Sequence, residues 1–369
     1  MLAIPTICTL LLSQLALPDP EPLVSPSDFQ GWINAAQEGT LAIPKKADQT
    51  ARGFQYVFVG GFGNEWISGY FARNAKELQA RGVSRSAIHF VYPSSHQTIE
   101  EHAAEVHERF HAIAHSRPER LVIIAHSQGA CDAMAFALQE PEFVKDRVEA
   151  LFLIQGPFGG SAVADYVRGE GPEMDARMPA RFRVVAKVLT HGERFLLNHG
   201  KHGGLIGITR NEARQFWARQ LEENAAAIPM ISSKTYFLLS ETDPSELSLF
   251  KKPSGWYLSL YDGPNDGLVA VSDQFLPNIG TVLGVVDCGH GDLTHHTPLS
   301  HTNKRLPQAL IQSVVMAVAN IEENEEREAR ESPPFRRVSG NVPQTETEKP
   351  ASKDETRARR SLFSRRGRS

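Results

Sequence analysis

The sequence predicts an α/β protein with a mostly parallel sheet and helices on both of its faces. The prediction rests on the alternation of short apolar runs with helix-like segments between about residues 50 and 320 of the 369-residue chain. Alternation of this kind is typical of strands joined by helical crossovers, which bury a parallel sheet on both sides. Hydrophobic residues make up 41% of the chain, which is enough for a sizeable core.

Each strand and helix is expected where the pattern is clearest. Six apolar, strand-like runs lie at residues 56–59, 88–92, 121–125, 150–154, 236–239 and 282–286. Four helix-like segments lie at residues 70–80, 99–114, 130–139 and 308–320. Right-handed crossovers place the carboxyl ends of parallel strands at one edge of the sheet, and functional sites collect there.

Three regions are expected along the chain: an N-terminal leader at residues 1–50, a main domain at 51–320 and a disordered, charged tail at 321–369. The leader begins with a short apolar run in residues 1–18, which is either a weak secretory signal or an extension packed on the domain. Residues 161–231 interrupt the alternation. They predict a helical cap over the edge of the sheet, and the alternative is an ordinary packed insertion.

Composition and charge exclude several classes of protein. The formal net charge of -4 argues against a nucleic-acid-binding protein, and three cysteines form no disulfide framework. No segment resembles a membrane-spanning helix. The tail ends in a basic stretch suited to anionic lipid or nucleic acid, although a solvated tail is the simpler interpretation. The compartment and the oligomeric state stay open; the cytoplasm is slightly favoured, because no Lys or Arg precedes the N-terminal apolar run.

The stretch LVIIAHSQGA at residues 121–130 places a serine directly after a buried strand. Ser127 lies between Ala125 and Gly129, in an A-x-S-x-G pattern that differs from the usual G-x-S-x-G at its first position. Small residues on both sides allow a sharp strand-to-helix turn that presents the hydroxyl above the sheet. Ser127 is therefore predicted to be a nucleophile, and the alternative is that it only caps the next helix.

A serine nucleophile needs a histidine base and an acid that orients this base. In this architecture the acid and then the histidine follow the serine along the chain. His290 comes after the last apolar run, and Asp262 and Asp266 lie in a Gly-, Pro- and Asn-rich loop before it. His290 also belongs to a dense cluster of residues with metal-ligand chemistry, so a metal site is the alternative, although the spacing of the cluster fits no known motif. The cluster comprises His290, Asp292, His295, His296 and His301.

Two backbone amides are predicted to form an oxyanion hole, which acyl transfer requires. One belongs to Gln128, the residue after the serine, and the other to Phe62 in the glycine-rich segment 60–63. The alternatives for this segment are a plain turn and a phosphate loop. The nucleotide-binding patterns G-x-G-x-x-G and G-x-x-x-x-G-K-[ST] are both absent, so nucleotide binding is not expected.

Taken in order, these motifs resemble the α/β-hydrolase superfamily, and within it the bacterial triacylglycerol lipases and related serine esterases. The resemblance covers about residues 56–320 and implies the α/β-hydrolase fold with a Ser127–His290–Asp266 triad. Three positions depart from the family pattern: Gly60 and Phe158 each stand where histidine is usual, and Ala125 stands where glycine is usual. The matching segments are VGGFGN, AHSQGA, GPFGGSAVADYV, NDGLV and GHGDL.

The resemblance also raises the question of a metal ion. Those lipases carry a structural calcium near the histidine loop, and Asp292 lies at a matching place. His296, however, stands where a side-chain oxygen would be expected. We therefore expect no metal and no cofactor.

These observations predict a serine hydrolase of lipid metabolism that cleaves carboxylic esters through an acyl-enzyme. The expected substrate is a small-molecule or lipid acyl ester, with transient contact to a lipid surface but no stable membrane span and no nucleic-acid partner. The same triad fits a thioesterase, an amidase or an acyltransferase. A non-catalytic binding module is a further alternative, and the presence of Ser127, Asp266 and His290 together argues against it.

Overall fold

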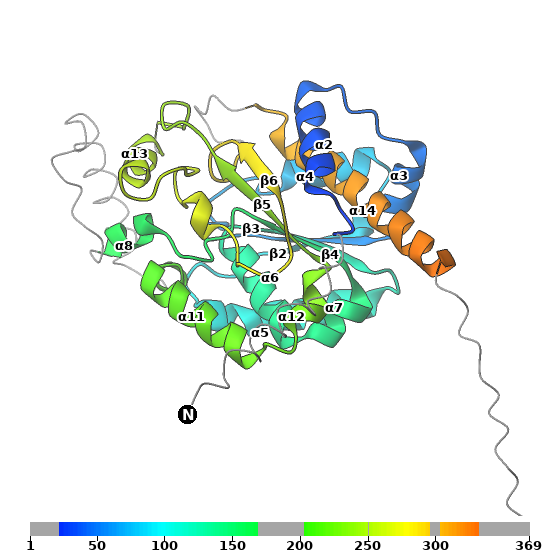
Figure 1. Cartoon of the computed structure of the whole chain (residues 1–369), viewed down its shortest axis with the longest axis horizontal. Coiled ribbons are helices and arrows are strands. Elements are labelled where there is room, and N and C mark those ends of the chain that lie inside the picture. Colours follow the sequence, from blue (N-terminus) through cyan, green and yellow to red (C-terminus); the bar gives the residue numbers. More distant parts are fainter. Residues whose placement is uncertain (1–21, 169–202, 250, 296–302, 332–369) are drawn as a thin grey trace, which may run out of the picture.

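The structure is a computed structural model that describes residues 22–168, 203–249, 251–295 and 303–331 (Figure 1). Three expectations fall wholly or partly outside these ranges: the secretory signal in residues 1–18, the middle of the predicted cap and most of the charged tail. Within the described ranges, no helix combines the length and the hydrophobicity that a bilayer crossing requires.

A six-stranded sheet forms the centre of the domain, in the order β2-β1-β3-β4-β5-β6. Every neighbouring pair of strands is parallel. Each strand lies at the apolar run that predicted it, with β2 ending one residue earlier than its run, and strands β1, β3 and β4 are buried at every position. The strands are β1 (Gln55–Val59), β2 (Ile88–Val91), β3 (Leu121–His126), β4 (Val148–Ile154), β5 (Thr235–Glu241) and β6 (Thr281–Asp287).

Two layers of helices cover the two faces of the sheet (Figure 1). Alternate residues of one strand point to opposite layers: Val122 and Ile124 belong to one buried core, and Ile123 and Ala125 to the other. The first layer contains α2 (Pro26–Glu38), α3 (Lys45–Ala51), α4 (Ala72–Ala80) and α14 (Leu306–Glu331). The second layer contains α5 (Ile99–Ser116), α6 (Gln128–Gln139), α7 (Pro141–Arg147), α11 (Arg210–Glu223) and α12 (Ile228–Ser232).

Shorter elements complete the described chain. They are η1 (Arg85–Ala87), α8 (Ala162–Arg168), α10 (Gly203–Gly207), α13 (Lys252–Tyr261) and η2 (Val271–Asp273). Along the chain, η1 precedes β2, α8 and α10 follow β4, and α13 and η2 lie between β5 and β6.

The predicted boundary of the main domain needs correction at its carboxyl end. At the amino end, the second half of the leader is packed on the domain, which is one of the two interpretations of this segment: α2 and α3 lie there, and α2 buries Phe29 and Ile33 in the first core. At the other end, α14 continues to Glu331, so residues 321–331 are helical and do not belong to a disordered tail. This stretch is held to the domain by Ile321, which is buried in the first core, and by Asn324, which donates to the carbonyl oxygen of Leu23 at 2.8 Å. Glu323 and Glu325 add ion pairs with Lys46 and Arg120, each at 3.4 Å.

The predicted cap also needs correction, because only part of it lies at the edge of the sheet. Helix α11 buries Ala213 and Trp217 in the second core, beside α6. Residues 210–232 therefore cover a face of the sheet. Helices α8 and α10, by contrast, contribute residues to a cavity at the carboxyl edge of the sheet.

Candidate active site

Ser127 occupies a sharp turn between β3 and α6, with φ 57° and ψ -131°. A positive φ is strained for a residue with a Cβ, and such strain is found most often at functional sites. The Ser127 N–H donates to the carbonyl oxygen of Ile154 at 2.9 Å, which ties the turn to the neighbouring strand β4. The side chain makes no capping hydrogen bond to α6. The hydroxyl is thus held above the sheet edge and turned away from the helix that it precedes.

Small residues around the turn allow two backbone segments to meet there. A Cβ on Gly129 would lie 2.5 Å from the carbonyl oxygen of Gly60 and 2.8 Å from that of Val59. A Cβ on Gly61 would lie 2.6 Å from the Cβ of Ser127. Both glycines are therefore required for packing, and the glycine-rich segment 60–63 lies directly beside the serine.

His290 and Asp266 complete a chain of hydrogen bonds that starts at the serine. The Ser127 Oγ lies 2.9 Å from Nε2 of His290, and Nδ1 of His290 lies 2.8 Å from Oδ2 of Asp266. Asp266 is fully buried, whereas Ser127 and His290 are 8% and 7% exposed. The structure therefore brings together the three residues from separate loops that the sequence singled out, with only the serine end open to solvent.

The loop that carries Asp266 is held by its own hydrogen bonds. Oδ1 of Asp266 accepts from the N–H groups of Leu268 and Val269, and Oδ2 accepts from the hydroxyl of Ser240. The carboxylate therefore has a fixed orientation, with one oxygen aimed at His290. The other acid considered from the sequence, Asp262, forms an ion pair with Arg210 instead and has no contact with the histidine.

The segment after β4 anchors the surrounding elements. Phe158, at a position where the resemblance implies histidine, packs against Trp217 and Phe237. The Ser161 hydroxyl donates to the carbonyl oxygen of Leu268 at 2.6 Å, and so supports the Asp266 loop. The aromatic ring at position 158 thus serves packing in the second core.

A second hydrogen-bonded chain beside the histidine was not predicted from the sequence. Gln155 Oε1 accepts from the N–H of Gly291 at 2.9 Å, and Gln155 Nε2 donates to the carbonyl oxygen of Gly289 at 3.2 Å. These are the two neighbours of His290, so a single side chain clamps the loop on both sides of the ring. The only sequence signal was a polar residue directly after a buried strand.

His126 links this clamp to the glycine-rich segment. Its Nε2 lies 2.9 Å from Gln155 Oε1, and its Nδ1 lies 2.5 Å from the hydroxyl of Tyr70. Burial lowers the pKa of His126 well below its usual range, with a further contribution from the charge of His290. The ring is therefore neutral: Nε2 donates to the amide oxygen, and Nδ1 accepts from Tyr70. The Tyr70 oxygen in turn accepts from the N–H of Gly61 at 3.2 Å.

The two amides expected to stabilise an oxyanion belong to the segments that meet at the serine. The Gly61 N–H already donates to the Tyr70 hydroxyl. The next amide in the segment, that of Phe62, is therefore the candidate donor to an oxyanion. Within the described part of the chain, no acceptor is bonded to the Phe62 N–H. Gln128 is the first residue of α6, where backbone N–H groups point out of the helix.

A mainly apolar cavity of about 380 Å³ opens over Ser127 and His290. Its walls come from the segment around Phe62, from the Leu268 loop, and from the helices α8 and α10. A cavity of this size and character suits a small or medium-sized apolar ligand. Its apolar lining includes Phe62, Trp66, Ile67, Val163, Val167, Leu205, Ile208, Leu268 and Val269.

The Asp292 carboxylate, which the resemblance connects with a calcium ion, is held by contacts within the protein. One oxygen of Asp292 accepts from the N–H of Gly289 at 3.1 Å, and the positive charge near its carboxylate comes from Lys251. The Lys251 ammonium also donates to the carbonyl oxygen of His290. In the ranges that the structure describes, no three histidine, cysteine or acidic side chains converge at this loop, and His296 and His301 lie outside those ranges.

Comparison with solved structures places this architecture among known folds. The chain is similar to the metagenomic carboxyl esterase MGS0156, with a TM-score of 0.52 and 20% identity over 74% of this chain and 76% of that one. It also matches the mature form of the Bacillus licheniformis lipase BlEst2, with a TM-score of 0.49 and 16% identity over 71% and 91% of the two chains. The second similarity is too weak to add to the argument. No protein-family model and no curated protein matches the chain.

The parallel sheet, the covering helices and the similarity to the esterase structure define the α/β-hydrolase fold. The chain has this fold, as the sequence motifs predicted. At the identity observed, the similarity is evidence for the fold alone.

Proposed function

We propose that this protein is a serine hydrolase that cleaves carboxylic esters with an apolar acyl chain. The single observation that carries the proposal is the continuous hydrogen-bonded chain from the Ser127 hydroxyl through His290 to the buried Asp266, at the base of an apolar cavity. A serine in this arrangement loses its proton to the histidine as it attacks, which is how serine hydrolases activate a weak nucleophile.

In the proposed reaction, the Ser127 Oγ bonds to the acyl carbon while its proton passes to Nε2 of His290. The electron pair of the carbonyl moves to its oxygen, which the amides of Phe62 and Gln128 stabilise. The intermediate then expels the alkoxide, which takes the proton from His290, and an acyl-enzyme remains. Water attacks this ester by the same route, and the acid leaves. Asp266 stays ionised and holds His290 in the tautomer that accepts the serine proton.

The test is the Ser127→Ala variant in an assay with p-nitrophenyl esters of increasing chain length. We expect kcat to fall by at least about 10³-fold, because loss of the nucleophile leaves only binding and oxyanion stabilisation. The matched control is Ser116→Ala, which removes an exposed serine hydroxyl at the end of α5, away from the cavity, and should retain the activity of the wild type.

A second measurement separates inactivity from a wrong choice of substrate. A fluorophosphonate probe should label the wild type at Ser127 and leave the Ser127→Ala variant unlabelled. Equal ester hydrolysis in both proteins, or labelling at another residue, would show that Ser127 is not the nucleophile. Parallel assays with thioesters and amides of the same acyl chains define the bond that is cleaved.

A further inference from the structure

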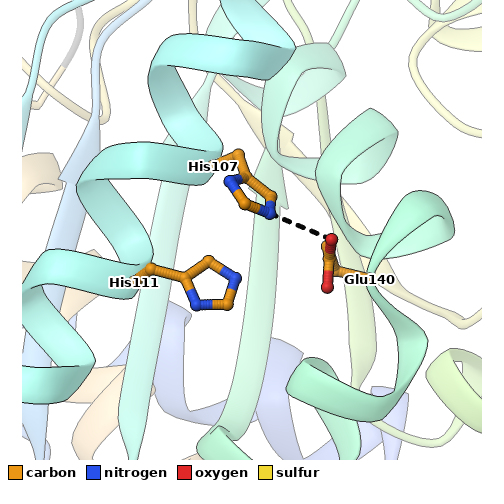
Figure 2. A group of neighbouring side chains, drawn as sticks. All are labelled: His107, His111 and Glu140. Atoms are coloured by element: carbon orange, nitrogen blue, oxygen red, sulfur yellow. Dashed lines mark hydrogen bonds and ion pairs between the residues drawn. The ribbon is translucent and has the colours of Figure 1, made fainter. Parts of the chain in front are cut away.

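A second group of side chains with ligand chemistry lies on the outer helices, away from the cavity. His107 and His111 belong to α5, and Glu140 lies at the junction of α6 and α7 (Figure 2). Each of the three offers an atom suited to metal binding, and these atoms all lie within 4.8 Å of one another. Nε2 of His107 is 2.9 Å from Oε1 of Glu140. No part of the proposed ester hydrolysis uses these residues.

The spacing of the two histidines explains why they share a face. The segment His107-Glu108-Arg109-Phe110-His111 follows the pattern H-E-x-x-H, which places two imidazoles one helical turn apart on the same side. Figure 2 shows both rings projecting from α5 toward Glu140. The third side chain comes from a distant part of the sequence, because α6 packs against α5.

Aromatic neighbours orient the two rings. The His111 ring lies 4.5 Å from that of Phe143, the His107 ring lies 6.0 Å from that of Phe136, and the two imidazole centroids are 4.4 Å apart. The side chains are therefore positioned by packing, before any ion binds. A preorganised set of ligands loses less conformational entropy on binding.

One imidazole nitrogen in this group has an unmet hydrogen-bonding need. Nε2 of His111 is buried and has no hydrogen-bond partner among the described residues. Buried polar atoms are nearly always bonded, so an orphaned one at a cluster of ligands calls for an explanation.

The group is accessible to ions from solvent. The side chains of His107 and Glu140 are 46% and 36% exposed. An ion can therefore reach the site without opening the core, and a water molecule can complete its coordination. Half-exposed ion pairs contribute little to stability by themselves, so the His107–Glu140 contact alone gives no reason for such an arrangement.

We propose that His107, His111 and Glu140 bind one divalent transition-metal ion, zinc being the best match to two imidazoles and a carboxylate. Two histidines, one glutamate and a water form a tetrahedral set that zinc accepts readily. Ligand atoms at about 2.0–2.1 Å from the ion lie roughly 3.3 Å apart, so the three side chains need only small movements. Binding replaces the hydrogen bond between His107 and Glu140 with a bond from each side chain to the ion, and the neutral His107 ring keeps its one proton on the nitrogen that does not bind.

The ion would connect the middle of α5 to the end of α6. Helix α6 has 12 residues and begins next to Ser127, so at 1.5 Å per residue the site lies about 18 Å along the helix from the nucleophile. The expected effect of the ion is to stabilise the packing of α5 on α6. It is independent of the ester chemistry proposed above.

The test uses the full chain after treatment with a chelator, titrated with zinc chloride against a chromogenic competitor. We expect one zinc ion to bind per chain. The variants His111→Gln and Glu140→Gln should each lower the affinity by at least about tenfold, because each removes a ligand. The matched control is His115→Gln, one helical turn beyond His111 and exposed, which should bind zinc as the wild type does. Cobalt(II) should give the visible absorption of a tetrahedral site in the wild type and the control only.

Thermal unfolding provides a readout that does not depend on activity. Zinc should raise the Tm of the wild type and of His115→Gln, and should leave that of Glu140→Gln unchanged. Glu140 is exposed enough for this variant to fold even if His111→Gln does not. Failure of the wild type to bind zinc more tightly than about 100 µM would overturn the proposal. Unchanged affinity in both ligand variants would place the ion elsewhere and would overturn it equally.

Discussion

His290 is bound to Asp266 twice, once through its side chain and once through its backbone. Nδ1 of the ring lies 2.8 Å from the carboxylate, and the N–H of His290 donates to the carbonyl oxygen of Asp266 at 2.7 Å. The loop that carries the histidine is thus fixed to the loop that carries the acid. Substitution of the carboxylate alone should therefore change the tautomer of the ring while the two loops stay in place.

The first prediction concerns Asp266→Asn. The amide that replaces the carboxylate can donate to Nδ1, which favours the tautomer with the proton on Nε2, and this tautomer cannot accept the serine proton. We expect kcat for ester hydrolysis to fall by roughly 10³–10⁴-fold with little change in KM. The control is Asp262→Asn, which breaks only the ion pair with Arg210 and should stay within a few-fold of the wild type. Equal losses in both variants would contradict the assignment of the acid.

The second prediction concerns Gly61→Ala. The added methyl group would lie 2.6 Å from the Cβ of Ser127 and 3.2 Å from its Oγ, so it would push the serine or the glycine-rich segment out of position. We expect kcat to fall by at least about 10²-fold while the fold persists, because small misplacements of reacting groups are costly. Steady-state kinetics and circular dichroism measure both effects.

Gly31→Ala is the matched control for this substitution. No atom lies within 4 Å of a Cβ at this position in α2, so the change should leave activity intact. It should also raise the stability by roughly 0.5–1 kcal/mol, because alanine is the better helix former. Full activity of Gly61→Ala would show that the segment does not constrain the nucleophile.

The third prediction concerns Gln155→Met, which keeps the volume of the side chain and removes its hydrogen bonds. The N–H of Gly291, the carbonyl oxygen of Gly289 and the imidazole of His126 would then be buried without partners. Each such loss costs about 1–3 kcal/mol. We expect lower stability and a kcat reduced by about 10–100-fold, with KM nearly unchanged, because Gln155 positions His290 and does not touch the substrate.

A comparison with Gln155→Glu distinguishes positioning from simple loss of stability. The carboxylate keeps an acceptor for Gly291 and His126 but loses the donor to Gly289. It should therefore retain more activity than the methionine variant at a temperature where both are folded. If both variants were as active as the wild type while being destabilised, Gln155 would have only a structural role.

Much of the fold was predictable because its signals are local. Buried parallel strands read as continuous apolar runs, so all six strands were found, with ends that differ by no more than two residues. The residues of the hydrogen-bonded chain at the serine were also identified, because turns with small residues surround each of them. Local patterns do not give the distances between these residues, so they could not decide whether Asp262 or Asp266 contacts His290.

Features that depend on distant contacts were not predictable. The acidic end of α14 has the composition of a disordered segment, but it is anchored by contacts far away in the sequence, such as that of Asn324 with Leu23 and the burial of Ile321 in the first core. Likewise, the clamp formed by Gln155 has no motif, because its partners come from the loop around His290. The ligand group around His107 was readable only in part: His107 and His111 follow the H-E-x-x-H pattern, which was overlooked, whereas Glu140 joins them only in the folded chain.

The last prediction concerns the pH dependence of stability. Glu149 is buried on β4, 2.8 Å from Arg120, and burial raises the pKa of Glu149 to about 7 from its ordinary value of 4.5. Arg120 opposes this shift, and the charge of Glu325 adds to it. Between about pH 4.5 and 7 the folded chain therefore holds a proton that the unfolded chain has lost. The free energy of unfolding should fall as the pH rises through this window.

Glu149→Gln should remove this part of the pH dependence, because the amide does not titrate. Measured by urea unfolding, the wild type should lose about 2 kcal/mol more than the variant between pH 5 and pH 8. The difference between the two profiles of unfolding free energy against pH cancels the contributions of other titrating groups, which both proteins share. The altered contact with Arg120 cancels as well where its contribution is the same at every pH. Parallel stability profiles for the two proteins would show that Glu149 is ionised in the fold throughout this range, and that Arg120 compensates its burial in full.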